Sequence, residues 1–243
     1  MRILLIADIH ANLVALEAVV ADAGAVDLTW CLGDVVGYGP RPNECVAWVE
    51  EHAAATVVGN HDWACLGRLD PGEFNDAAYA ATMWTIETLT PHAHDWLESL
   101  PNRYIEGEQT LVHGSPRHPI WEYVLRPSTA AANFPFFDTE ICFIGHTHMP
   151  VIFPENLAKR GEALYQPPVG KPVTLTKGER YLVNPGSVGQ PRDGDPRASY
   201  AIFDPETRQI EYRRLAYDIA ATQKQMAAAG LPLPLITRLS HGL

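Results

Sequence analysis

The chain has 243 residues, of which 47% are hydrophobic, so it can bury one large core or two small ones and is not a disordered chain. Its formal net charge of −11 argues against binding to a nucleic-acid polymer. The four cysteines form no C-x-x-C pair and no apolar segment reaches the length of a membrane span, so we expect a reduced, cytoplasmic protein outside the membrane.

The first part of the chain alternates predicted strands with predicted helices. Strands are predicted over 2–7, 28–32 and 55–58, and amphipathic helices over about 12–23 and 42–54 connect them. This β-α-β-α-β order predicts a parallel sheet with helices over one face. Each strand leads into polar residues, and α/β folds place their ligands at that end of a strand.

The middle of the chain changes from helix to hairpin. Residues 63–100 are predicted to be helical and to form a cap against one sheet face, with residues available for substrate contacts. A hairpin is predicted over 103–113, and residues 120–138 have an irregular or weakly helical pattern. The apolar run 141–144 predicts another buried strand.

Short strands dominate the chain after Met149. They are predicted to form an antiparallel meander, followed by a helix over 218–229. The tail 231–243 is apolar and interrupted by prolines, and the sequence leaves open whether it packs on the body or mediates homo-oligomer formation. Since no repeat or linker interrupts the chain, we expect one domain over 1–243. The predicted meander strands cover 151–153, 173–175, 180–183, 199–204 and 209–215.

Residues that can bind metals or transfer protons follow the predicted strands. Asp8 and His10 follow the first strand two positions apart, a spacing that in a strand sends both side chains to the same side. His146 and His148 repeat this spacing after the strand 141–144. The complete set contains half of the ten histidines and consists of Asp8, His10, Asp34, Asn60, His61, His113, His146 and His148.

This set of side chains suits a pair of metal ions. Imidazole and carboxylate ligands together favour Mn, Fe, Zn, Co or Ni over Mg or Ca. Two ions about 3.5–4 Å apart need a bridging carboxylate, and a water between them becomes a hydroxide nucleophile at neutral pH. Asn60 offers a neutral oxygen ligand, which leaves His61 free to act as a general acid.

The motifs at these positions resemble those of a known family. D-I-H at 8–10, G-D at 33–34, G-N-H-D at 59–62, L-V-H-G-S at 111–115 and G-H-T-H at 145–148 resemble the calcineurin-like metallophosphoesterases. The resemblance covers most of the chain, from Asp8 to about Arg192. It implies an α/β fold of two stacked mixed β-sheets flanked by helices, a four-layer α/β/β/α sandwich.

The resemblance also implies roles for individual residues. Asp34 would bridge the two metals, for which manganese is favoured in activity, and His61 would be the catalytic histidine that protonates the leaving oxygen. Asp62 would support the ligands from behind them. The implied ligands are Asp8, His10, Asp34 and His148 for one metal, and Asp34, Asn60, His113 and His146 for the other.

One block departs from the pattern of the protein Ser/Thr phosphatases. Their G-D-x-x-D-R-G is replaced by G-D-V-V-G-Y-G at 33–39, which lacks the second aspartate and the arginine. This block and the stretch 184–192 resemble the small bacterial and archaeal phosphodiesterase branch of the family. The missing aspartate leaves His61 without its usual partner.

The expected function is therefore a dinuclear metal-dependent phosphodiesterase that acts on a small soluble phosphoester. A phosphomonoesterase and a dinucleoside-polyphosphate hydrolase remain alternatives. A non-catalytic scaffold like the related retromer subunit is a third alternative, although that subunit lacks metal ligands that this chain retains. Arg117 and Arg192 follow glycine-containing loops, where clamping a substrate phosphate and forming a surface ion pair are equally good predictions. Tyr38 or Trp121 would stack on a base if the substrate were a nucleotide.

Overall fold

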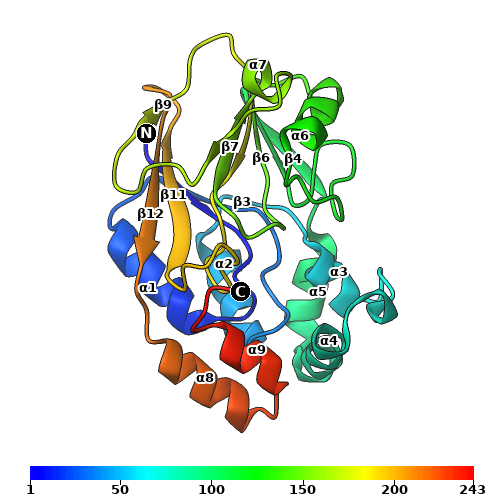
Figure 1. Cartoon of the computed structure of the whole chain (residues 1–243). Helices are drawn as coiled ribbons and strands as arrows, with labels where there is room; N and C mark the ends of the chain where they lie inside the picture. The colour runs from blue at the N-terminus through cyan, green and yellow to red at the C-terminus, as the bar shows by residue number, and fades with distance from the viewer.

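Two mixed β-sheets of six strands each form the centre of the computed structural model, which describes residues 1–243 (Figure 1). The first sheet has the order β3 (Ala55–Thr56), β2 (Leu28–Cys31), β1 (Ile3–Ile6), β11 (Ala198–Asp204), β12 (Gln209–Leu215) and β9 (Val173–Thr174). The second sheet has the order β4 (Arg103–Glu106), β5 (Gln109–Val112), β6 (Ile141–Phe143), β10 (Tyr181–Asn184), β7 (Val151–Pro154) and β8 (Leu164–Tyr165).

Helices cover the outer faces of both sheets. The helices α1 (Leu13–Ala23) and α2 (Pro42–His52) lie on the first sheet, and α6 (Pro127–Asn133) and α7 (Glu155–Ala158) lie on the second (Figure 1). Asn12 caps α1 by accepting a hydrogen bond from the Ala15 amide at 3.2 Å. The remaining helical elements are α3 (Asn60–Cys65), η1 (Pro71–Glu73), α4 (Asp76–Thr88), α5 (Pro91–Ser99), η2 (Phe134–Phe136), α8 (Ile219–Ala228) and α9 (Leu233–Arg238).

Alternation along β1 explains why its sequence is an uninterrupted apolar run. Ile3 and Leu5 belong to the cluster between the two sheets, whereas Leu4 and Ile6 belong to the cluster under α1 and α2. A third cluster fills the space between the second sheet and the helices α6 and α7. A strand buried on both faces has no solvated side and therefore no polar alternation. The four-layer α/β/β/α prediction is confirmed.

The pairing of the strands confirms one topological prediction and corrects another. The strands β1, β2 and β3 are parallel neighbours, as the β-α-β-α-β order predicts. The strands predicted after Met149 do pair antiparallel, β7 with β10 and β12 with both β11 and β9, but the prediction of one meander is wrong because they are divided between the two sheets. Strands of two to seven residues do not show from their own pattern which distant strand they pair with.

The C-terminal tail packs on the body of the protein. Its helix α9 contacts α4 and α8. Leu235 and Leu239 are buried in a cluster with Tyr38 and with Met226 of α8. No helix in the structure combines the length and the apolar character that crossing a membrane requires.

Leu235→Ala tests this packing. Because the side chain of Leu235 is 2% exposed, we expect the substitution to lower the free energy of unfolding by about 2–4 kcal/mol, measured by chemical denaturation. Leu233→Ala on the same helix is the matched control, since Leu233 is 68% exposed and its truncation should change stability little. Equal effects of the two substitutions would contradict the docking of α9.

Candidate metal centre

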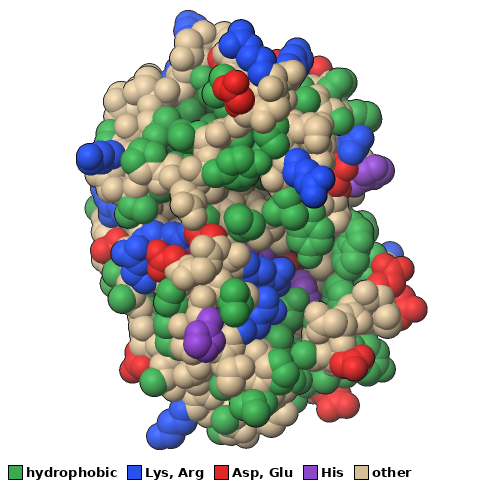
Figure 2. All heavy atoms as spheres, in the orientation of Figure 1, with side chains coloured by type: hydrophobic (Ala, Val, Ile, Leu, Met, Phe, Trp, Pro, Cys, Tyr) green, Lys and Arg blue, Asp and Glu red, His purple; other side chains and the backbone are tan.

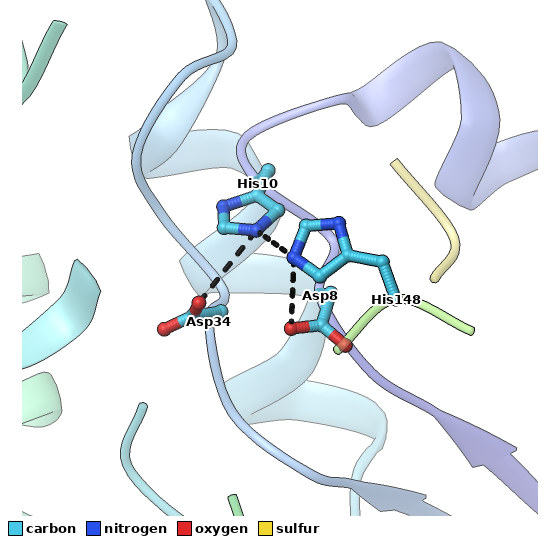
Figure 3. Close-up of side chains that lie close together, drawn as sticks. All are labelled: Asp8, His10, Asp34 and His148. Atoms are coloured by element: carbon cyan, nitrogen blue, oxygen red, sulfur yellow. Dashed lines mark hydrogen bonds and ion pairs between the residues drawn. The ribbon is translucent and has the colours of Figure 1, made fainter. Parts of the chain in front are cut away.

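The polar residues that follow five strands converge where the two sheets meet. They come from the ends of β1, β2 and β3 in the first sheet and of β5 and β6 in the second. Two groups of side chains have all their ligand atoms within 4.8 Å of one another, and Asp34 belongs to both. The first group is Asp8, His10, Asp34 and His148 (Figure 3), and the second is Asp34, His113 and His146.

The backbone at these positions is not that of a strand. Because β1 ends at Ile6, strand alternation is the wrong reason for the convergence of Asp8 and His10. Nine non-glycine residues of the chain have positive φ, a conformation that is costly for side chains with a Cβ. Five of the nine are in the two groups: Asp8 (52°), His10 (49°), Asp34 (53°), His146 (65°) and His148 (59°). Strain is therefore concentrated where these side chains are turned toward one another.

Main-chain carbonyls orient the histidine rings. A carbonyl can only accept a hydrogen bond, so a ring nitrogen that contacts one carries the proton and leaves the other nitrogen free as a ligand. His146 contacts the Trp121 carbonyl through Nε2 at 3.2 Å, which leaves Nδ1 free. The others donate from Nδ1 and direct Nε2 inward: His10 to Val36 (3.2 Å), His113 to Leu32 (2.8 Å) and His148 to Gln190.

The rings of His10 and His148 face each other (Figure 3), and their Nε2 atoms are separated by 3.0 Å. Burial lowers the pKa of both rings well below its usual value, so both are neutral and each Nε2 presents a lone pair to the other. The carboxylate of Asp8 lies 3.3 Å from His148 Nε2, and that of Asp34 lies 3.6 Å from His10 Nε2. Lone pairs and carboxyl oxygens that face one another form a set of donors suited to a cation.

The Oδ2 atom of Asp34 is buried and has no hydrogen-bond partner. It lies 3.3 Å from His113 Nε2 and 3.6 Å from His10 Nε2, so it faces both groups. Burial alone would lower the pKa of His113, but the contact with Asp34, the charge of Asp8 and the bond to the Leu32 carbonyl together outweigh burial and raise this pKa to about 9. Burial raises the pKa of Asp8 to about 8. Without a metal the centre therefore retains protons that two bound cations would displace, and the donor set fits such a pair.

The turn into α3 carries three further predicted site residues, which are Asn60, His61 and Asp62. The amide oxygen of Asn60 lies 3.0 Å from His113 Nε2, beside the second group. Asp62 accepts hydrogen bonds from the amides of Val36 (3.0 Å) and Gly59 (2.9 Å), and thereby ties the loop after β2 to this turn. Asp62 thus holds together the two segments of chain behind the centre.

His61 lies at the same turn without a charged partner. Its Nδ1 is buried and has no hydrogen-bond partner. The residue next to this nitrogen is Gly37, which has no side chain that could bond it. A Cβ at position 37 would lie only 3.0 Å from Nδ1. The ring of His61 therefore occupies the space that the side chain of the usual aspartate would need at position 37. Burial lowers the pKa of His61 to about 4, and its ring stacks on Phe74 with the centroids 4.6 Å apart.

A cavity of about 330 Å³ opens beside the centre. Figure 2 shows Lys or Arg and His side chains grouped beside a hollow near the middle of the face that it draws. Two larger hollows elsewhere are lined by none of the predicted site residues. The residues that line the cavity and carry its chemistry are Asn60, His61, Arg192, Arg238, Tyr38, Phe74, Trp121 and Tyr123.

The two arginines singled out in the sequence have different positions. Arg117 forms an ion pair with Glu122 and does not line the cavity, whereas Arg192 lines it. Arg238, Phe74 and Tyr123 also line the cavity but were not predicted from the sequence. None of these three belongs to a motif, and the charge of Arg238 within an apolar tail is the only signal that singles it out.

Comparison with known proteins agrees with this centre. The sequence model described as "Calcineurin-like phosphoesterase superfamily domain" matches residues 1–208. An uncharacterized protein from Methanocaldococcus jannaschii is 39% identical, over 99% of this chain and 98% of that protein. The phosphodiesterase YfcE from Escherichia coli K12 is 29% identical, over 84% of this chain and 88% of its own. The crystal structure of a metallophosphoesterase from Sphaerobacter thermophilus superposes with a TM-score of 0.93 at 56% identity, over 100% of this chain and 99% of that one.

Proposed function

The chain belongs to the calcineurin-like phosphoesterase superfamily, and from this premise we propose that it is a dinuclear metal-dependent phosphodiesterase that acts on a small soluble phosphoester. The observation that carries the proposal is the position of Asp34 Oδ2, which is buried, lacks a hydrogen-bond partner and faces both groups of ligands. The similarity to the phosphodiesterase YfcE supports a diester rather than a monoester as substrate.

Each cation would be held by four side chains, with Asp34 shared between them. When bound, the two cations, among which Mn²⁺ is favoured, supply Lewis-acid charge at the phosphoryl oxygens and lower the pKa of the attacking water. The proposed ligands are Asp8, His10, Asp34 and His148 for the first cation, and Asp34, Asn60, His113 and His146 for the second.

His61 is the proposed general acid. It lines the cavity next to Asn60, where it can pass a proton from its imidazole to the departing oxygen. The pKa of about 4 that burial gives His61 applies to the protein without metal and substrate, and an anionic phosphoester bound beside the ring would raise it. Substrate binding therefore promotes the protonated form that the reaction needs.

Arg192 is the proposed phosphate-binding arginine. Its guanidinium lines the cavity and is held by Gln190 Oε1 at 2.9 Å and by the Tyr38 hydroxyl at 3.4 Å. Both partners are neutral, so the positive charge remains available to a phosphoryl oxygen. Arg117 is not proposed for this role because its charge is paired with Glu122.

The substrate preference is tested by stripping the protein of metal, adding Mn²⁺ back and comparing two chromogenic esters. We expect faster turnover of bis(4-nitrophenyl) phosphate than of 4-nitrophenyl phosphate, and little turnover of either without metal. Faster turnover of the monoester would favour a phosphomonoesterase. Metal binding without turnover of either ester would favour a non-catalytic scaffold.

Metal binding should also stabilise the fold. A cation that binds only the folded chain adds about 2.7 kcal/mol to the free energy of unfolding when it is present at roughly 100 times its Kd. We therefore expect Mn²⁺ to raise the Tm of stripped protein in a thermal scan. Mg²⁺ is the control and should raise it less, since imidazole is a poor ligand for this ion. An unchanged Tm with Mn²⁺ would contradict the assigned centre.

A further inference from the structure

The C-terminal segment forms part of the active-site cleft although it lies outside the family match, which ends at residue 208. Arg238, at the last position of α9, lines the same cavity as His61 and Asn60. The segment is held there by Leu235 and Leu239, which are buried against Tyr38. This extension is therefore one wall of the cleft, built from residues that the family pattern does not supply.

Arg238 and Arg192 are two positive charges in one cavity, and no acidic side chain lies within ion-pair distance of either. Arg238 donates a hydrogen bond from Nε to a main-chain oxygen of Leu243, the last residue of the chain, and its Nη groups make no hydrogen bond within the protein. The acidic residue of the cavity lining is Glu73, which is exposed. Burial, followed by the charge of Arg192, lowers the pKa of Arg238. Two guanidinium groups without an acidic side chain as partner, in a chain of net charge −11, indicate a place for an anion.

The two arginines have different relations to the metal centre. Arg192 donates to the side chain of Gln190, whose main-chain carbonyl accepts the Nδ1 proton of the ligand His148. Gln190 therefore links Arg192 to the ligand His148, and this places Arg192 to hold the phosphate that reacts. Arg238 is connected instead to the end of the chain through Leu243. It is therefore available to a different group of the substrate.

Aromatic side chains line the rest of the cavity. Trp121 and Tyr123 are 38% and 46% exposed, so their rings present apolar surface to a ligand. Phe74 continues this wall, with its ring 5.6 Å from that of Trp121. The wall suits the organic part of a phosphoester and leaves the two arginines for its charged groups.

We infer that Arg238 forms a second phosphate subsite in the same cavity as Arg192, which holds the reacting phosphate, so that the preferred substrate is a phosphodiester that carries a further phosphate group. This inference rests on the proposed function. The guanidinium groups offer planar pairs of N–H donors that match the terminal oxygens of a phosphate. A phosphate group at each arginine would also reduce the repulsion between the two positive charges. The C-terminal extension would then determine specificity rather than serve only as packing.

The test compares two diesters that release the same 4-nitrophenolate and differ by one phosphate. They are thymidine 5′-(4-nitrophenyl phosphate) and its 3′-phosphorylated form. We expect kcat/KM of the wild-type protein to be at least about tenfold higher for the phosphorylated ester, the size of one charge-assisted hydrogen bond. The difference should lie in KM, since the contact exists before and during the reaction. Added salt should reduce it.

Arg238→Gln should bring the ratio of the two kcat/KM values close to one, and Arg238→Lys should retain part of it, because the charge remains without the planar donors. Arg160→Gln, at an exposed position outside the cavity, should keep the wild-type ratio. A wild-type ratio near one, or an unchanged ratio in Arg238→Gln, would overturn the inference. If Arg238→Gln does not fold, two other measurements test the inference. It would be overturned if high salt left the wild-type ratio unchanged and Arg238→Lys kept the full ratio. Turnover of bis(4-nitrophenyl) phosphate by the wild-type protein tests the proposed function separately.

Discussion

Asp34→Asn is expected to remove both metals and nearly all activity while the chain still folds. The substitution replaces the only carboxylate that faces both ligand groups, so neither set of four remains complete. The remaining buried charge is also reduced, which leaves less to attract a second cation. A bound divalent cation lowers the pKa of water from about 15.7 to about 7, so its loss should reduce turnover by several orders of magnitude.

The measurement is metal content by elemental analysis after dialysis, together with turnover of bis(4-nitrophenyl) phosphate. Asp138→Asn is the matched control, because Asp138 is exposed and outside both ligand groups. Circular dichroism should show a folded protein in both variants. Full occupancy by two metals in Asp34→Asn would remove Asp34 from the bridging position, even if activity were lost.

His61→Ala is expected to have a different signature: both metals remain and turnover falls. His61 is in neither ligand group, so its removal leaves the centre intact. A positioned general acid contributes about 10²–10⁴-fold to a rate, and we expect a loss in this range for a diester with a poor leaving group. The loss should be smaller for 4-nitrophenolate, which departs readily without a proton.

The comparison of leaving groups is what identifies the role. We would measure kcat for a series of aryl and alkyl diesters in wild type and in His61→Ala, with metal content determined for each preparation. His94→Ala, at an exposed histidine of α5, is the control. An equal loss for good and poor leaving groups would indicate that His61 positions the substrate and does not protonate it. Loss of metal would instead show that it supports a ligand.

The departure at Gly37 shows how a single position links the sequence to the geometry. The sequence shows that the usual aspartate is absent, and the structure shows that its place lies against the ring of His61, 3.0 Å from Nδ1. Without a carboxylate there, the ring is surrounded by Tyr38 and Phe74, whose centroids lie 4.3 and 4.6 Å from its own. Aromatic neighbours therefore orient His61, and its charge depends on what the cavity binds.

Much of the fold and the set of candidate ligands were predictable because they depend on local pattern. Apolar runs bounded by polar residues marked β1, β2, β3 and β6, and the crossover helices between the first three implied a parallel arrangement. Residues at the carboxyl ends of such strands are close in any fold of this kind. The reason given for Asp8 and His10 was nevertheless wrong, since left-handed backbone rather than strand alternation turns them inward.

The sequence by itself determined which side chains could bind metal and that they follow the ends of buried strands, since both depend on residue type and short-range periodicity. Only the tertiary structure decided which sheet each C-terminal strand joins, which carbonyl orients each imidazole, and that Arg238 reaches the cleft while Arg117 is paired elsewhere. These are contacts between segments far apart in the chain, and each results from the packing of the whole molecule rather than from a preference of its own residues.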